Sequence, residues 1–231
     1  SPKLIPTIVG IDFASVEEGK PPKDLKPFFE KVKAFNAVNP KRALDIVYHV
    51  GESYFDKSLE SAIRWCHEVA DIGAKRIGHA IALGLDPDIA LLRRTEAHEY
   101  ELVSERLDQI AYDLIHQVAL SNYGVSIDTT SLKAEAEQLK HQPSNDNIRR
   151  PYAQQRIDEV RGRQAFVLDH FTTLGTVIEC CPTSNLRIGG VPEVTHHPIH
   201  RFLKSNVKLV ICSDDPGNFD VTLASEINWV V

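Results

Sequence analysis

The 231-residue sequence contains no methionine at any position, the first included. We therefore expect either a processed or cloned fragment or a chain whose methionines were replaced, and a native full-length product is the option that we expect least. No apolar run approaches the roughly 20 residues that a membrane-spanning helix needs. The first six residues also lack the charged-then-apolar layout of a secretion signal. The sequence gives no reason to expect a membrane partner.

Positive charge is in the minority, with 26 Lys and Arg against 32 Asp and Glu, and no segment is densely basic. The overall charge therefore does not indicate binding to a nucleic-acid backbone. A local basic patch that binds nucleic acid is left open. Cysteine is scarce, and none of the four residues forms a C-x-x-C pair. This usage favours buried reduced thiols in a cytoplasmic protein over a disulfide or zinc-cysteine framework.

Segments typical of strands alternate with segments typical of helices, which predicts an α/β fold with parallel strands. A complete (β/α)₈ TIM barrel has eight such units in about 250 residues, so we predict an incomplete barrel with about five of them. The predicted strands are Leu4–Phe13, Ala43–Val50, Lys75–His79, Thr176–Cys181 and Lys208–Cys212. Helices are predicted over residues 24–35, 57–71 and 196–204, with a last one beginning at Thr222.

Nearly a hundred residues separate His79 from Thr176, where a barrel connection needs about a quarter of that number. We interpret residues 86–164 as an inserted helical subdomain, between barrel units 1–85 (strands 4–6) and 165–231 (strands 7–8). An apolar stripe in residues 96–120 suits a surface that buries against a homo-oligomer partner. The alternative is that the insertion is a substrate lid, whose arginines would bind the phosphates of a nucleotide. The ordinary interpretation of such arginines is a solvated helix face. Those arginines are Arg149, Arg150, Arg156, Arg161 and Arg163.

Polar side chains follow the predicted strands at the point where each strand ends. His49 and Glu52 follow the second strand, His79 ends the third, and Asp214 and Asp215 follow the fifth. In a barrel these strand ends meet at one pocket. Two histidines and three carboxylates suit zinc together with acid–base groups, which predicts a metal-dependent hydrolase. Taken singly, each residue could instead be a core histidine or a turn and helix cap.

Five ordered segments resemble motifs of the adenosine deaminase family, within the metal-dependent amidohydrolase superfamily. IDFASVEE, HVGES, RIGHAI, ECCPTSN and SDDPGNF are similar to that family's G-I-D-L-A-G-D-E, H-A-G-E, R-I-G-H-G, E-V-C-P-T-S-N and T-D-D-P. The resemblance covers nearly the whole chain outside the insertion. His197 falls in a region like the family's E-H-P helix start, so we expect it to be structural.

The resemblance implies a role for each matched residue. His49 and Asp214 would ligate Zn²⁺, and Asp214 would also accept a proton from the attacking water. Glu52 would protonate the purine ring nitrogen, His79 would orient the water, and Asp215 would hydrogen-bond the purine. The implied activity is hydrolytic deamination of adenosine or a related adenine nucleoside or nucleotide to the 6-oxo purine. Hydrolysis of another C6 substituent, or a non-catalytic assembly role, are the alternatives.

The sequence departs from the family pattern in two ways. It contains no H-x-H, the pair that supplies the family's first metal ligands, so we expect weak zinc binding and no activity from this chain alone. Ser15 stands where the family has a glycine beside the substrate, and Ala80 replaces the glycine after His79. Ser15 is therefore a predicted substrate-binding position at which specificity would change.

Overall fold

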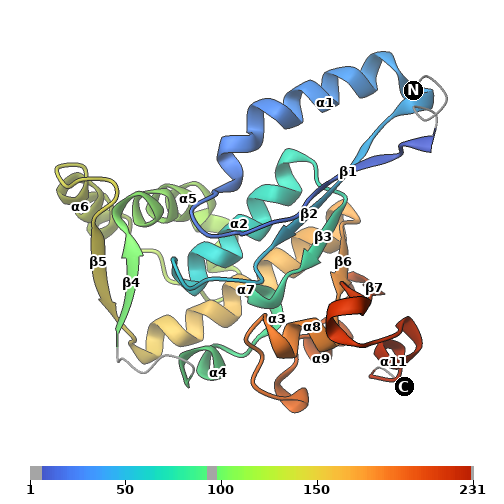
Figure 1. Cartoon of the computed structure of the whole chain (residues 1–231). Coiled ribbons are helices and arrows are strands. Elements are labelled where there is room, and N and C mark those ends of the chain that lie inside the picture. Colours follow the sequence, from blue (N-terminus) through green and yellow to red (C-terminus); the bar gives the residue numbers. More distant parts are fainter. Residues whose placement is uncertain (1–6, 93–97, 230–231) are drawn as a thin grey trace.

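The computed structural model describes residues 7–92 and 98–229, and its centre is a parallel five-stranded sheet (Figure 1). The strands are β1 (Gly10–Phe13), β2 (Asp45–Val50), β3 (Arg76–His79), β6 (Val177–Cys180) and β7 (Lys208–Ile211). All five predicted strands are present. Residues 4–6 of the first prediction, 96–97 of the insertion helix and 230–231 of the last helix lie outside the described residues.

The sheet order is β1-β2-β3-β6-β7, so strands that follow one another along the chain lie side by side. Every neighbouring pair is parallel. Parallel strands in sequential order, joined by helices, have the arrangement of a (β/α) barrel segment. The α/β prediction of an incomplete barrel with five strand units is confirmed. The carboxyl ends of all five strands consequently lie along one edge.

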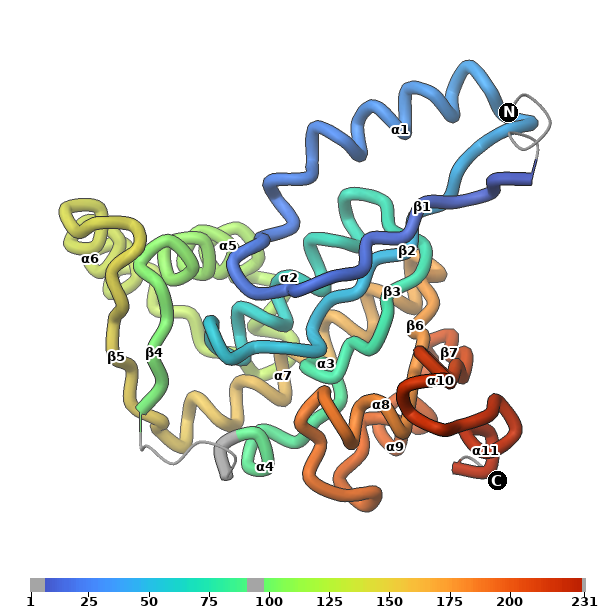
Figure 2. Tube along the Cα trace, in the orientation of Figure 1, coloured from blue at the N-terminus to red at the C-terminus, as the bar shows by residue number. Residues whose placement is uncertain are grey.

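Helices connect the strands and build the insertion, and the colour gradient of Figure 2 traces their order along the chain. None of the described helices is both long and apolar enough to cross a membrane. The α-helices are α1 (Lys26–Val38), α2 (Leu59–Ile72), α3 (Ile81–Gly84), α4 (Pro87–Leu92), α5 (Val103–Ser121), α6 (Thr129–Leu139), α7 (Gln154–Leu174), α8 (Pro182–Arg187), α9 (Ile199–Phe202), α10 (Pro216–Phe219) and α11 (Leu223–Ile227). Short 3₁₀ turns cover Pro22–Leu25, Pro40–Arg42 and Val194–His196.

Helices α2 and α7 pack against each other and against the sheet, and the main core lies between them. Ser58 caps the N-terminus of α2 through the backbone N–H of Ser61. Gly73 ends the helix at a φ of 119°, a conformation that glycine adopts without steric cost. Trp65 of α2 and Phe171 of α7 are almost fully buried in this core.

The insertion is mostly helical, as predicted, but it also contains a two-stranded antiparallel sheet, β4 (His98–Leu102) with β5 (Asn147–Pro151). The sequence analysis assigned both segments to a helical subdomain, and for these residues the assignment is wrong. The alternately buried residues of β4 are Glu99 and Glu101, at 2% and 0% exposure. A hydrophobicity pattern cannot detect a strand whose buried positions are carboxylates.

The predicted boundary between residues 164 and 165 falls inside α7, which is continuous across it. Helix α7 contacts α4 and α5 of the insertion and also packs along α2. The three-part division therefore stays a prediction, and α7 is shared by the insertion and the barrel segment. The apolar stripe of α5 is confirmed at Val103 and Ile110, which are buried, whereas Val118 is 72% exposed.

Candidate active site

The two predicted site histidines lie next to each other at the carboxyl edge of the sheet. His49 is the penultimate residue of β2 and His79 is the last residue of β3. Their ring centroids are 5.1 Å apart, with the ring planes at 83°. Glu52 joins them, because its Oε1 lies 3.4 Å from Nδ1 of His79. The predicted convergence of these three residues is confirmed by geometry.

Gly78 provides the space that the His49 ring occupies. The two residues are directly opposite in the β2–β3 register. A Cβ on Gly78 would lie 2.6 Å from Cδ2 of His49, closer than real Cβ atoms approach any neighbour. The glycine of the RIGH motif is therefore needed for the ring to lie flat over β3.

Several residues around the pocket have backbone conformations that favour glycine. φ is 66° at His79, 49° at Ala80 and 57° at Asp214. Ser15, which stands where the family has glycine, has a φ of 151°. Each such non-glycine residue costs on the order of 1–3 kcal/mol, and conformations of this kind cluster at functional sites.

The three consecutive residues Thr183, Ser184 and Asn185 hold the pocket together. Thr183 donates through N and Oγ1 to the buried Glu226 of α11, at 2.9 and 2.6 Å. The Ser184 hydroxyl donates to Oδ2 of Asp214 at 2.6 Å. The Asn185 side-chain amide nitrogen lies 3.0 Å from Nδ1 of His79. The sequence analysis found this motif but assigned no role to its residues.

Glu52 is held in an environment that favours its protonated form. Burial raises the pKa of its carboxyl from 4.5 to about 7, and the negative charges of Asp214, Glu17 and Glu18 add to the effect. Its Oε1 is buried and has no hydrogen-bond partner among the described residues. A carboxyl that is about half protonated at neutral pH is suited to general acid catalysis.

Glu17 fixes the backbone that carries Glu52, and sequence reasoning missed it. Its carboxylate accepts the backbone N–H groups of Gly51, Glu52 and Ser53, each at 3.1 Å. Lys57 lies 3.8 Å away, with its side chain fully buried. Glu17 lies in the segment IDFASVEE, which resembles a family motif, and this position was the signal that could have identified it.

His79 is neutral at physiological pH. Burial lowers the pKa of its imidazole to about 4, the neighbouring His49 lowers it further, and Asp214 opposes the shift. Because an amide nitrogen can only donate, Nδ1 of His79 accepts from Asn185. The ring proton is therefore on Nε2, the nitrogen directed away from Asn185.

Asp214 lies within a cluster of potential metal ligands. His79, Cys181 and Asp214 each offer one ligand atom, and these three atoms lie within 4.8 Å of one another. Imidazole, thiolate and carboxylate are all ligands that zinc accepts, so the donor set fits a zinc ion. His49, predicted to share the ion with Asp214, lies outside this cluster but beside its His79 member.

A cleft of about 190 Å³ opens beside these groups. It is lined by Ser15, Val16, Glu17, Glu18, His49, Glu52, Ser53 and Ile188. Ser15, a predicted substrate-binding position, is thus one of the residues that line this cleft. Asp215 instead caps α10, accepting the backbone N–H groups of Gly217 and Asn218 at 3.2 Å each, so the structure gives its carboxylate a structural partner.

His197 is structural, as expected. It is 2% exposed, and its Nδ1 accepts the backbone N–H of Ile199 at 3.0 Å. The four cysteines are free thiols, and three of them are buried.

The insertion arginines are mostly engaged in ion pairs. Arg163 donates to Asp113 at 2.8 Å, and Arg156 donates to Glu60 at 2.8 Å. Arg150 donates to Glu101 at 2.8 Å. These pairs are largely buried, so neither a phosphate-binding lid nor a solvated helix face describes them. The other two arginines are more exposed. Arg161 pairs with Asp86 at 3.1 Å, and Arg149 lies 3.0 Å from Nδ1 of His98.

The fold and the pocket define the class: an α/β protein of the barrel type, with acid, imidazole and carboxylate groups at the carboxyl ends of parallel strands. Residues 157–231 match the adenosine deaminase family model. It is the family whose motifs the sequence resembles.

Curated relatives match over short segments. An adenine deaminase of Rhizobium leguminosarum bv. trifolii is 45% identical over 53 residues, which are 23% of this chain and 16% of the relative. An adenosine deaminase-like protein of Drosophila melanogaster is 47% identical over 49 residues, 21% of this chain and 14% of the relative. An aminodeoxyfutalosine deaminase of Acidothermus cellulolyticus is 38% identical over 52 residues, 22% of this chain and 15% of the relative.

The chain also aligns with the crystal structure of an adenine deaminase from Arthrobacter aurescens. The alignment has a TM-score of 0.49 and 17% identity, and it covers 100% of this chain and 43% of the other. The chain thus spans less than half of this solved relative.

Proposed function

We propose that this chain forms the C-terminal part of the active site of an enzyme that hydrolytically deaminates an adenine-type purine. The observation that carries the proposal is the contact between Glu52 and His79, at 3.4 Å, on the pocket edge of the sheet. The adjacent residues Ser184 and Asn185 link this pair to Asp214, because Ser184 donates to Asp214 and Asn185 contacts His79. The family match over residues 157–231 supports the same reaction class.

His49 and Asp214 would hold the catalytic zinc, with Cys181 near enough to contribute, while His79 stays available to the attacking water. The cluster of His79, Cys181 and Asp214 supports the fit. A bound zinc ion lowers the pKa of water towards 7 and so supplies a nucleophile at neutral pH. Because this sequence contains no H-x-H, the remaining ligands would have to come from a segment outside it.

The roles of the chain's own groups follow from their protonation states. Glu52, with a pKa of about 7, donates a proton to the purine ring nitrogen as the water oxygen adds to C6. Neutral His79 orients the water through its Nε2–H. Asp214 takes the proton that the water loses, using the carboxylate oxygen that Ser184 does not occupy. Asp214 then returns its proton to the amino nitrogen, and the C6 hydroxyl gives its proton back to Glu52 as the 6-oxo group forms. The C6–N bond breaks in this step, and ammonia leaves with the 6-oxo purine as product.

The substrate class is a 6-aminopurine, as free base or nucleoside. The cleft is bounded by Ser15, Val16 and Ile188, and no arginine or lysine lines it. The ion pairs of the insertion arginines also argue against recognition of a nucleotide phosphate. Asp215 remains a proposed contact to the purine, in addition to its capping role.

The test uses the longest reading frame that contains this chain, assayed with adenine, adenosine and AMP. Deamination is followed by the loss of the adenine absorbance. Glu52→Gln should lower kcat by at least about 100-fold, the usual contribution of a general acid. Glu30→Gln, on exposed α1, is the matched control and should leave kcat unchanged. Full turnover by Glu52→Gln would overturn the assigned role, and no turnover of any 6-aminopurine would favour the assembly role instead.

A further inference from the structure

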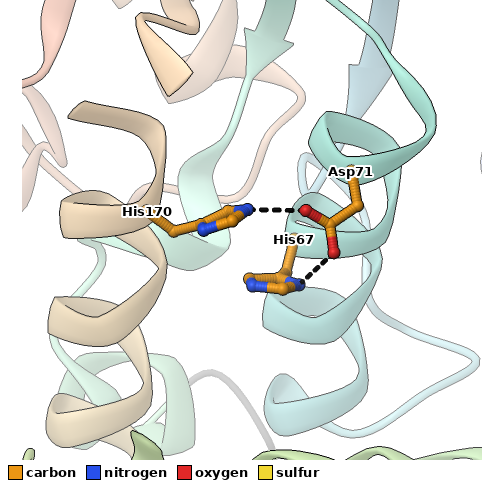
Figure 3. A group of neighbouring side chains, drawn as sticks. All are labelled: His67, Asp71 and His170. Atoms are coloured by element: carbon orange, nitrogen blue, oxygen red, sulfur yellow. Dashed lines mark hydrogen bonds and ion pairs between the residues drawn. The ribbon is translucent and has the colours of Figure 1, made fainter. Parts of the chain in front are cut away.

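Three side chains outside the pocket converge between α2 and α7. His67 and Asp71 are one turn apart on α2, and His170 faces them from α7 (Figure 3). Asp71 Oδ2 lies 3.5 Å from Nδ1 of His67, and Asp71 Oδ1 lies 2.7 Å from Nε2 of His170. Both imidazoles direct a nitrogen towards the same carboxylate (Figure 3).

This cluster lies away from the candidate active site. Asp71 is in the last turn of α2, and His170 is in the last two turns of α7. Helix α2 ends just before β3 begins, and α7 ends just before β6 begins. The cluster is therefore at the edge of the sheet opposite the pocket that holds His49, His79 and Asp214.

We propose that His67, Asp71 and His170 form a second divalent-metal site, of the kind that takes Zn²⁺. One ligand atom from each of the three residues lies within 4.8 Å of the others. Ligands of a tetrahedral zinc ion, bound at about 2.0–2.1 Å, lie about 3.4 Å from one another. The 3.5 Å between His67 and Asp71 already matches this spacing, and small side-chain rotations bring His170 into it.

The surroundings hold the ligands in place and in the right protonation state. His67 is 2% exposed, stacks on Phe166 at 5.2 Å and on His170 at 4.2 Å, and meets Tyr112 edge-on at 5.4 Å. Burial lowers the pKa of its imidazole to about 3, so its lone pair is free at neutral pH. Asp71 is exposed, which gives an ion access from solvent.

A fourth donor is nearby on the insertion. His116 of α5 has its ring centroid 5.0 Å from that of His67 and is half-buried. An ion bound by His67, Asp71 and His170, with His116 as a further ligand, would connect the insertion to two helices of the barrel segment. The site would therefore stabilise the packing of α5 and α7 on α2, and it does not depend on the proposed deaminase activity.

The experiment measures the unfolding temperature of the 231-residue chain in EDTA and in Zn²⁺, and the visible absorption of the chain with Co²⁺. At a metal concentration about a hundred times Kd, Tm should rise by roughly 5 °C. Asp71→Asn keeps the shape of the side chain and should weaken binding at least about tenfold, as should His170→Asn. His141→Asn, an exposed histidine elsewhere, is the matched control.

Asp214→Asn separates this site from the pocket. The proposal holds if the metal-dependent rise in Tm and the Co²⁺ absorption persist in Asp214→Asn and His141→Asn but are lost in Asp71→Asn and His170→Asn. It is overturned if Asp71→Asn responds to metal like the unsubstituted chain, if only Asp214→Asn loses the response, or if Tm of the unsubstituted chain does not change with metal.

Discussion

Asn185 lies 106 positions from His79 in the sequence, yet its side-chain amide nitrogen is 3.0 Å from Nδ1 of the histidine. The amide thereby fixes which ring nitrogen carries the proton. Asn185 is fully buried within α8, one residue after the serine that binds Asp214. A single short motif thus positions two of the residues to which we assign the chemistry.

Replacing Asn185 should therefore affect catalysis more than substrate binding. Asn185→Ala frees the His79 ring to change tautomer and leaves its Nδ1 without a donor. We expect kcat to fall about 10- to 100-fold with little change in KM, as for other residues that orient a catalytic ligand. Steady-state kinetics on the complete enzyme measure both values. A change in KM alone would show that Asn185 does not position His79.

Gly78→Ala should destabilise the chain by about 1–3 kcal/mol, because the new methyl group would overlap the His49 ring. Gly217→Ala is the control, since its added Cβ would meet Oδ1 of Asp215 at an ordinary 3.5 Å. Urea denaturation of both variants gives the free energy of unfolding. Equal values for the two variants would contradict the close approach of His49 to Gly78.

Ser15→Gly should stabilise the chain, because the φ of 151° at this position suits glycine. Relief of this strain is worth on the order of 1–2 kcal/mol, reduced by the greater freedom of glycine in the unfolded chain. Ser126→Gly is the control: it is exposed, does not have a positive φ, and should be destabilising. Thermal unfolding decides between these outcomes, and a loss of stability in Ser15→Gly would contradict the assignment.

The stability of the metal-free chain should depend on pH through Glu52. Its pKa rises from 4.5 in the unfolded chain to about 7 in the folded one, so the folded state binds more protons between these values. The Glu52 contribution to stability is therefore present below pH 4.5 and is lost as pH rises through 7. At pH 8, Glu52→Gln should be more stable than the unsubstituted chain by up to about 3 kcal/mol.

Urea denaturation in EDTA at pH 5, 6, 7 and 8 measures this dependence. The difference between Glu52→Gln and the unsubstituted chain should grow with pH, while Glu30→Gln should track the unsubstituted chain. A constant difference across this range would show that Glu52 titrates normally in the folded state.

The buried ion pairs of the insertion should be far more sensitive to truncation than the exposed ones. Arg156 donates to both Glu60 and Glu99, which are 5% and 2% exposed. Arg156→Ala leaves two buried carboxylates without this partner and should cost about 3–5 kcal/mol. Arg161→Ala breaks pairs with exposed Asp86 and Asp88 and should cost about 0–1 kcal/mol. Similar losses for the two variants, measured by chemical denaturation, would contradict the structure.

The sequence alone determined the parallel α/β fold and which polar residues lie at the carboxyl edge of its sheet. Apolar segments such as Ala43–Val50 define the strands, and parallel strands place whatever follows them at a common edge. The positions of His49, Glu52, His79 and Asp214 at that edge follow from this local rule, without knowledge of any particular contact.

Tertiary structure decided the features that depend on contacts between distant segments. Glu17 accepts three backbone N–H groups from a segment more than 30 residues away. The side chains of Thr183, Ser184 and Asn185 likewise contact distant residues. No sequence periodicity relates the partners in these contacts. Strand β4 escaped prediction because its buried side chains are carboxylates neutralised by arginines from elsewhere in the chain. The cluster of His67, Asp71 and His170 exists only because α7 packs along α2 in a register that sequence spacing does not encode.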